Sequence, residues 1–220
     1  RRTWRPPSRK DTENTLTAPT DEQLLIAHLA GKPDAFELIV RRHHQELYRF
    51  VLRFTNNSAA AEDVVQEALL QVYQSAATFD QTRRFKPWLF TIAANKARDW
   101  LRVRNRRSEL PLDAPMQGDQ FDGEKSFRDL LAAEPADQSA EMEFEDQRRQ
   151  VRIIVEKMPE NLREVLILAY YHKMPYKTIA EVIHIPVGTV KSRLHAAVAH
   201  FGRAYKEAME IDPLKEVEHP

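Results

Sequence analysis

Cysteine is absent from this chain of 220 residues, and glycine is scarce, with five glycines against thirteen prolines. The absence of cysteine excludes disulfide bonds and thiolate metal sites, and it is compatible with a reducing compartment. Few glycines and many prolines are typical of helices separated by short linkers. Since no apolar run approaches the roughly 20 residues that a membrane-spanning helix needs, we expect no membrane insertion.

Histidine is the other common metal ligand, and the arrangement of the eight histidines is unfavourable for a metal site. None of them forms an H-x3-H pair flanked by carboxylate ligands, which is a spacing that metal sites use. A nuclease would need such a set or a cluster of carboxylates, and neither is present. We therefore expect no metal, no cofactor and no enzymatic activity.

Charge is balanced over the whole chain but segregated along it, so the net charge of zero is misleading. Residues 83–107 contain nine Lys or Arg and one acid, which gives +8, whereas residues 108–147 contain two bases and twelve acids, which gives −10. A basic helix beside an acidic linker is typical of a nucleic-acid binder whose linker stays off the DNA or competes weakly for the basic face. Ordinary solvated surfaces are the alternative.

Residues 176–201 predict a helix-turn-helix, a common device for placing one helix in a DNA major groove. Two helical patterns are separated by a break at His184 to Pro186. The second pattern has an apolar stripe and a second stripe that is expected to face outward. The apolar stripe consists of Val187, Val190, Leu194, Ala197, Val198 and Phe201, and the outward stripe of Lys191, Ser192, His195 and Ala199.

Two further helices are predicted at the start of the chain, after an arm (residues 1–19) that has no periodicity and is expected to be disordered. Thr20 and Gln23 have the spacing of a capping box. The helix that follows is expected to bury Leu24, Leu25 and Leu29. Pro33 suits the first turn of a second, longer helix, which a Thr-Asn-Asn sequence ends.

A third helix, with Ser58 as the expected N-cap, has two distinct faces. Its core stripe consists of Ala61, Val64, Val65, Ala68, Leu69 and Val72, and its opposite face contains Asp63, Gln66, Glu67 and Leu70. An exposed leucine among acids and an amide favours a docking surface. An ordinary solvated face is the alternative.

Aromatic and basic residues alternate through a predicted loop at residues 77–86 and the helix that Pro87 is expected to open. The aromatic residues are Phe79, Phe85 and Trp88, and the basic residues are Arg83, Arg84 and Lys86; Asn95, Arg98 and Arg102 share one face of the helix. Single-stranded DNA binding uses rings that stack on bases and arginines that follow phosphates. For Trp88 and Trp100, core packing is the alternative.

Three of these segments, in this order, resemble the sigma-70 superfamily, specifically the extracytoplasmic-function group of RNA polymerase sigma factors. They are AEDVVQEALLQVY, FKPWLFTIAANKARDWLR and YKTIAEVIHIPVGTVKSRLHAA. The resemblance implies an all-α fold with two small helical domains. A region 2 domain (residues 20–107) and a region 4 domain (141–209) are expected on either side of a flexible acidic linker (108–140), with a tail (210–220) at the end.

The resemblance also implies roles for individual residues. Asp63, Gln66, Glu67 and Leu70 match the polymerase-docking face. The −10 DNA contacts are expected at Phe79, Arg83, Arg84, Phe85, Lys86, Trp88, Asn95, Arg98 and Arg102, where a loop closes on a flipped base. The −35 contacts are expected at Lys177, Thr189, Lys191, Ser192, Arg193 and His195, with Lys191 as the best candidate for a guanine edge.

A cytoplasmic transcription initiation factor is therefore the expected function. Its partners by resemblance are bacterial core RNA polymerase, promoter DNA and an anti-sigma factor. A free-standing helix-turn-helix repressor is the alternative, which explains residues 176–201 but leaves the face of Asp63, Gln66 and Glu67 without a role.

Overall fold

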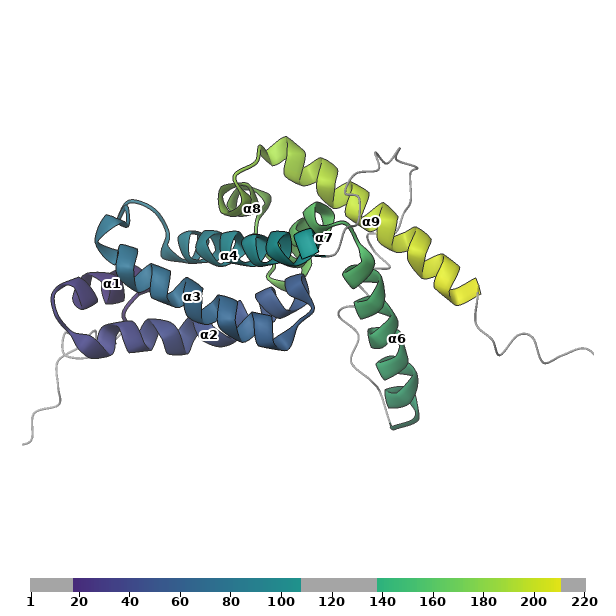
Figure 1. Ribbon diagram of the computed structural model, residues 1–220, viewed down its shortest axis with the longest axis horizontal. Helices are drawn as coiled ribbons and strands as arrows, with labels where there is room; N and C mark the ends of the chain where they lie inside the picture. The colour runs from purple at the N-terminus through teal and green to yellow at the C-terminus, as the bar shows by residue number, and fades with distance from the viewer. Residues whose placement is uncertain (1–17, 108–137, 211–220) are drawn as a thin grey trace, which may run out of the picture.

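A computed structural model describes residues 18–107 and 138–210, and all regular secondary structure in these ranges is helical (Figure 1). None of the described helices is long and apolar enough to cross a bilayer. The elements in chain order are α1 (Asp21–Leu29), α2 (Pro33–Thr55), α3 (Ser58–Ser75), the 3-10 turn η1 (Ala76–Thr78), α4 (Phe85–Arg107), α6 (Gln138–Lys157), α7 (Glu160–Leu166), the π-helical turn η2 (Ile167–Tyr171), α8 (Tyr176–Ile183) and α9 (Val187–Glu210).

Helices α1 to α4 form a bundle in which α2, α3 and α4 lie side by side (Figure 1). The predicted core stripe of α3 is buried throughout. Large aromatic residues fill the centre of the bundle, and four of them are completely buried: Phe50, Phe54, Phe85 and Phe90. Burial of this apolar surface is the main stabilising contribution to a bundle of this kind.

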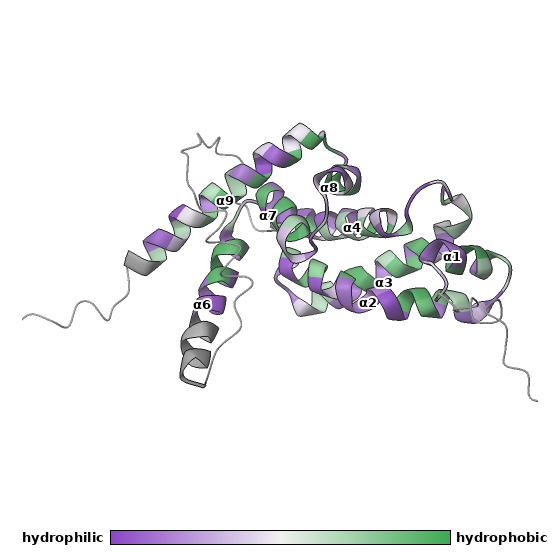
Figure 2. Cartoon of the chain, turned by 180° about the vertical axis from the view of Figure 1, so that it is seen from behind, coloured by the Kyte–Doolittle hydropathy of each residue, from purple (hydrophilic) through white to green (hydrophobic). Residues whose placement is uncertain are grey.

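Helices α6 to α9 form a second group, which packs against one end of the bundle. Helix α8 contacts α4, and both α7 and η2 contact α2. Figure 2 shows that hydrophilic residues run along much of α4 and α9. We call this packing of α7, η2 and α8 on α2 and α4 the closed arrangement.

The all-α fold is confirmed, and two local details of its first domain agree with prediction. Thr20 and Gln23 form the capping box, with Thr20 Oγ1 accepting from the Gln23 amide at 3.2 Å. Pro33 is the first residue of α2. The expected disorder of the first residues and of the linker falls largely on residues 1–17 and 108–137, which lie outside the described residues.

Several expected helix starts and burials are wrong in detail. The N-cap of α3 is Asn57, not Ser58, because the Asn57 side chain accepts from the amide of Ala60 at 2.8 Å. Helix α6 begins at Gln138, three residues before the position at which the region 4 domain is expected to start. Leu29 is 46% exposed at the last turn of α1, and Ala199 is buried, since a small side chain fits where α9 meets its neighbours.

Candidate functional site

The predicted docking face of α3 is exposed as a unit. Asp63, Gln66, Glu67 and Leu70 all lie on the surface, and Leu70 is 56% exposed. The burial of the opposite stripe explains this, because residues three and four positions apart share one side of a helix. An exposed leucine beside two carboxylates is an arrangement suited to a protein partner.

Two neighbours of this face were not predicted. Tyr73 is 53% exposed one turn beyond Leu70, and its ring packs on Phe36 with the centroids 5.1 Å apart. Its spacing of three residues from Leu70 is the signal that would have identified it. Lys96 of α4 lies 3.3 Å from the carboxylate of Glu67, so the docking face borders the helix that carries the expected DNA contacts.

The aromatic residues around the loop before α4 are mostly buried, which differs from the expectation that they contact bases. Phe85 is completely buried and Phe79 is 8% exposed, and their rings pack edge to face. Trp88 is half-buried, with its ring centroid 4.7 Å from that of Phe79. Phe79 and Phe85 therefore support the loop from below, and among these three rings Trp88 has the most surface available to a ligand.

Helix α4 starts at Phe85, two residues before the predicted start at Pro87. The Glu22 carboxylate of α1 accepts the Phe85 amide at 2.8 Å, which satisfies one of the free N–H groups at the helix start. This hydrogen bond is the main cause that lowers the pKa of Glu22. Carboxylates at helix N-termini are stabilised in the same way, so α1 fixes where α4 begins.

The loop tip carries the expected basic residues Arg83 and Arg84, and both are exposed. Asp80 organises this tip by accepting hydrogen bonds from the Thr82 amide at 3.0 Å and the Thr82 hydroxyl at 2.7 Å. These hydrogen bonds lower the pKa of Asp80. Arg83 lies 3.4 Å from the same carboxylate, so the tip is an ordered turn that presents positive charge.

The outward face of α4 carries Asn95, Arg98 and Arg102, as predicted. Asn95 is exposed, and its side-chain oxygen accepts from Arg98 at 2.8 Å. Arg102 is exposed and pairs with Asp99 at 2.9 Å. The hydrogen bond from Arg98 holds the Asn95 side chain in place, with the NH2 group of the amide directed away from Arg98.

The helix-turn-helix has the predicted geometry in α8 and α9. His184 adopts the left-handed conformation, with φ 55° and ψ 47°, and ends α8. Side chains such as histidine reach this region less easily than glycine. On the outer surface Lys177, Lys191, Ser192 and His195 are exposed, whereas Thr189 and Arg193 are half-buried. The Ser192 hydroxyl donates to the Thr189 carbonyl at 3.1 Å.

A buried carboxylate lies in the contact between the two helical groups. Glu164 of α7 is 4% exposed, and its Oε1 lies 3.4 Å from Nε of Arg98. Among the described residues this oxygen has no hydrogen-bond partner. Burial raises the pKa of Glu164 to about 7, although the charges of Arg98 and Arg193 oppose the rise. One predicted DNA residue, Arg98, is therefore engaged in this contact.

A second ionic contact involves the predicted DNA residue Lys86. Its Nζ lies 2.7 Å from the Glu46 carboxylate of α2, and His172, which follows η2, lies 3.4 Å from the same oxygen. The hydrogen bond from His172 is the main cause that lowers the pKa of Glu46 to about 2, with a further contribution from Lys86. Only the contact from His172 crosses between the two helical groups, because Lys86 and Glu46 both belong to the first group. Sequence periodicity does not identify this contact.

Family comparison assigns both groups of helices. Residues 39–107 match the family model for Sigma-70 region 2, and residues 148–201 match that for Sigma-70, region 4. The first match contains α3 and all of the −10 candidates, and the second contains the helix-turn-helix. Both regions occur in the order expected from the sequence.

Curated relatives agree with this assignment. RNA polymerase sigma-H factor of Pseudomonas aeruginosa is 32% identical over 185 residues, which cover 83% of this chain and 92% of that protein. ECF RNA polymerase sigma factor SigW of Bacillus subtilis is 34% identical over 167 residues, covering 75% and 86%. ECF RNA polymerase sigma-E factor of Escherichia coli K12 is 30% identical over 178 residues, covering 81% and 90%.

Two solved structures share the fold. CnrH, in complex with the cytosolic domain of CnrY, aligns with a TM-score of 0.60 at 22% identity, covering 85% of this chain and 97% of CnrH. The sigma factor RpoE of Bartonella quintana, in complex with the anti-sigma factor NepR, aligns with a TM-score of 0.56 at 20% identity, covering 80% and 98%.

These matches overturn the alternative of a free-standing repressor, since sigma region 2 precedes the helix-turn-helix in the same chain. The matched residues cover more than half of the sequence. The chain belongs to the sigma-70 family and is an RNA polymerase sigma factor of the extracytoplasmic-function group.

Proposed function

We propose that this sigma factor, which binds core RNA polymerase and directs it to promoters, contacts its partners through three separate faces. The α3 face of Asp63, Gln66, Glu67 and Leu70 docks on polymerase. Its supporting observation is that the four residues are exposed together on one side of a helix whose other side is buried. We place Tyr73 at the edge of this face because it is the exposed aromatic nearest to Leu70 along α3.

The −10 element is held by the loop tip and the outer face of α4. Opening the duplex and extruding a base costs a few kcal/mol. Asn95 offers an amide for base-edge hydrogen bonds, while Arg83, Arg84 and Arg102 offer charge to the phosphates of the separated strand. Trapping the opened strand in this way requires no nucleotide hydrolysis and no catalytic residue.

The −35 element is contacted by α9, with α8 crossing the DNA backbone beside it, as in other helix-turn-helix proteins. Lys191 is the proposed base-reading residue because it is exposed near the start of α9. Lys177, Ser192 and His195 are exposed around it. Such a complex forms where polymerase and promoter DNA are found, in the bacterial cytoplasm.

The closed arrangement is a resting state that opens on promoter binding. The −35 and −10 elements are roughly 25 base pairs apart, or about 85 Å along B-form DNA at about 3.4 Å per base pair. With α8 packed on α4, the two DNA-reading helices are too close together to reach both elements. In addition, Arg98 is held by Glu164 across the contact between the two helical groups. A regulator such as an anti-sigma factor would act by holding this arrangement.

The promoter is first identified as the genomic fragment, within a pool, from which the polymerase transcribes when this chain is added. The test then combines the full chain with core polymerase and a duplex of that promoter. We expect gel filtration to show a complex with polymerase, and strand opening to follow on the duplex. The double variant Asp63→Ala with Glu67→Ala should weaken polymerase binding by at least tenfold. Binding at wild-type strength in this variant would rule out the proposed docking face.

The matched control is Asp34→Ala with Glu37→Ala. Each double variant removes two exposed acids and one surface ion pair, since Glu67 pairs with Lys96 and Glu37 pairs with Arg41. The control acids lie on α2, outside the proposed face. Equal loss of polymerase binding in both variants would indicate a general effect of charge rather than docking at α3.

A further inference from the structure

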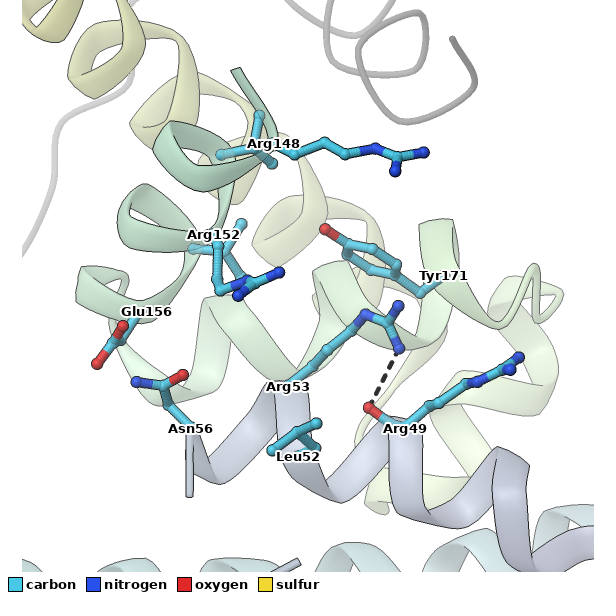
Figure 3. A pocket seen from close by; sticks show the side chains of 10 residues that line it. Arg49, Leu52, Arg53, Asn56, Arg148, Arg152, Glu156 and Tyr171 are labelled. Carbon is cyan, nitrogen blue, oxygen red and sulfur yellow. Dashed lines mark hydrogen bonds between the residues drawn. The ribbon is translucent and has the colours of Figure 1, made fainter. Parts of the chain in front are cut away.

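A basic cavity of about 600 Å³ lies between α2 and α6, beside η2 (Figure 3). Arg49 and Arg53 of α2 line one side, and Arg148 and Arg152 of α6 line the other. Glu156 is the only acid among the described residues that line the cavity, and in Figure 3 its carboxylate points away from the guanidinium groups. None of these residues belongs to the three faces described above.

The arginines of each helix are four residues apart, so they lie on the same side of their helix and repel one another. The Arg53 guanidinium lies 4.3 Å from the centroid of the Tyr171 ring and donates to the Arg49 carbonyl at 3.2 Å. Burial lowers the pKa of Arg53, and the charges of Arg49 and Arg152 lower it further. Positive charges from both helical groups therefore meet here at an energetic cost.

The partial negative charge at a helix C-terminus can stabilise only some of the arginines in this cluster. Arg53 is in the last turn of α2, where the partial negative charge of the helix terminus stabilises a cation. Arg152 lies before the last turn of α6, which continues to Lys157, and the effect is confined to the last turn. A bound anion would stabilise all four arginines.

The chemistry of the lining indicates the class of anion. Guanidinium groups bind phosphate through paired N–H donors, and four arginines against one glutamate favour a ligand with several negative charges. The volume falls in the range of small-molecule sites and exceeds what a single phosphate needs. We propose that this cavity binds a di- or triphosphate group, either as the inorganic ion or as part of a nucleotide.

Occupation of the cavity stabilises the closed arrangement, because α2 belongs to region 2 whereas α6 and η2 lie in or beside region 4. An anion that contacts both sides removes the repulsion between them and favours their association. This second part rests on the closed resting state proposed above. The binding of the anion does not depend on that resting state, so anion binding and its effect on the closed arrangement are tested by separate measurements.

Binding is tested by isothermal titration of the full chain with inorganic triphosphate and, separately, with ATP. One ion should bind per chain. Arg49→Gln and Arg152→Gln should each weaken binding at least tenfold, and Arg49→Lys should also weaken it because the forked geometry is lost. Arg41→Gln is the matched control, since Arg41 lies two turns earlier on α2 and does not line the cavity.

The outcomes separate the sources of the phosphate group. Similar affinity for triphosphate and ATP indicates that the phosphates alone are recognised, whereas tighter binding of ATP indicates contacts with the nucleoside. Absence of binding at millimolar concentrations of triphosphate and ATP would overturn the proposal. That result would also be obtained if the acidic segment 108–147 of the chain, rather than an added anion, occupied the cavity. Equal weakening in Arg41→Gln would also overturn it, because attraction would then be non-specific. Cooperative thermal unfolding of the glutamine variants confirms that they fold.

The effect on the closed arrangement is measured by distances between spin labels. Since the chain has no cysteine, Gln45→Cys on α2 and Glu181→Cys on α8, both exposed, provide two specific labelling positions. Added triphosphate should narrow the distance distribution and increase the closed population at least threefold, and Arg152→Gln should abolish the response. Binding without this change would overturn the coupling while leaving the anion site in place.

Discussion

Glu164 of α7 and Arg98 of α4 form an ion pair, 3.4 Å apart, across the contact between sigma regions 4 and 2. The arginine does not compensate fully for the burial of its partner, because burial raises the pKa of Glu164 to about 7 from an ordinary value of 4.5. In the closed arrangement this carboxyl therefore keeps its proton to a higher pH than an exposed glutamate does.

This pair predicts that the closed population depends on pH. Opening that exposes Glu164 is least favourable below pH 4.5 and becomes more favourable as pH rises to about 7, because the exposed carboxyl loses its proton over that range. The difference is on the order of 3 kcal/mol. Spin-label distances measured between pH 5 and pH 7.5 should show opening in the wild type and a smaller response in Glu164→Gln. The exposed Glu207→Gln is the control, and a response in Glu164→Gln as large as in the wild type would contradict the assignment.

Lys191 predicts a sequence-specific contact. In the polymerase complex, Lys191→Ala should weaken binding to the −35 element by about 1 to 3 kcal/mol and relax the preference at one base pair. Lys177→Ala, on the helix that crosses the backbone, should instead weaken all sequences equally and reduce the salt dependence. Competition binding with a panel of single-base variants distinguishes the two patterns. A uniform loss for Lys191→Ala would make it a phosphate contact.

His184 predicts a stabilising substitution. A residue other than glycine in the left-handed region costs roughly 1 to 2 kcal/mol, and glycine returns about 0.5 to 1 kcal/mol of this as unfolded-state entropy. With φ at 55°, His184→Gly should raise the free energy of unfolding by up to about 1 kcal/mol. Chemical denaturation of the two proteins measures this. A loss of stability would mean that the histidine side chain makes a contact that outweighs the backbone strain.

The amphipathic helices could be predicted from the sequence because their burial follows a local period. The α3 stripe that includes Val64 and Val72 is buried as expected, and Asp63 and Glu67 are exposed as expected. The helix-turn-helix could also be predicted from the sequence, because His184 and Pro186 mark its turn. Local spacing carries this information because neighbours along a helix share a face.

The features that could not be predicted from the sequence depend on long-range packing. Phe79 and Phe85 lie in a segment for which no periodicity was found, so their burial could not be predicted from spacing. Glu164 lies within a helical pattern, yet it is buried where Arg98 of a distant helix approaches it. The arginine cavity combines residues about 100 positions apart, which no local pattern reveals.

The hydrogen bond from the Phe85 amide to Glu22 joins residues that are 63 positions apart. The matched region 2 starts at residue 39, so a fragment cut at that boundary would lose α1 and leave the first turn of α4 without its carboxylate cap. DNA-binding measurements on such a fragment would underestimate the affinity of the intact protein for DNA. Truncations for structural or binding studies should therefore begin at or before Thr20, where the capping box starts α1.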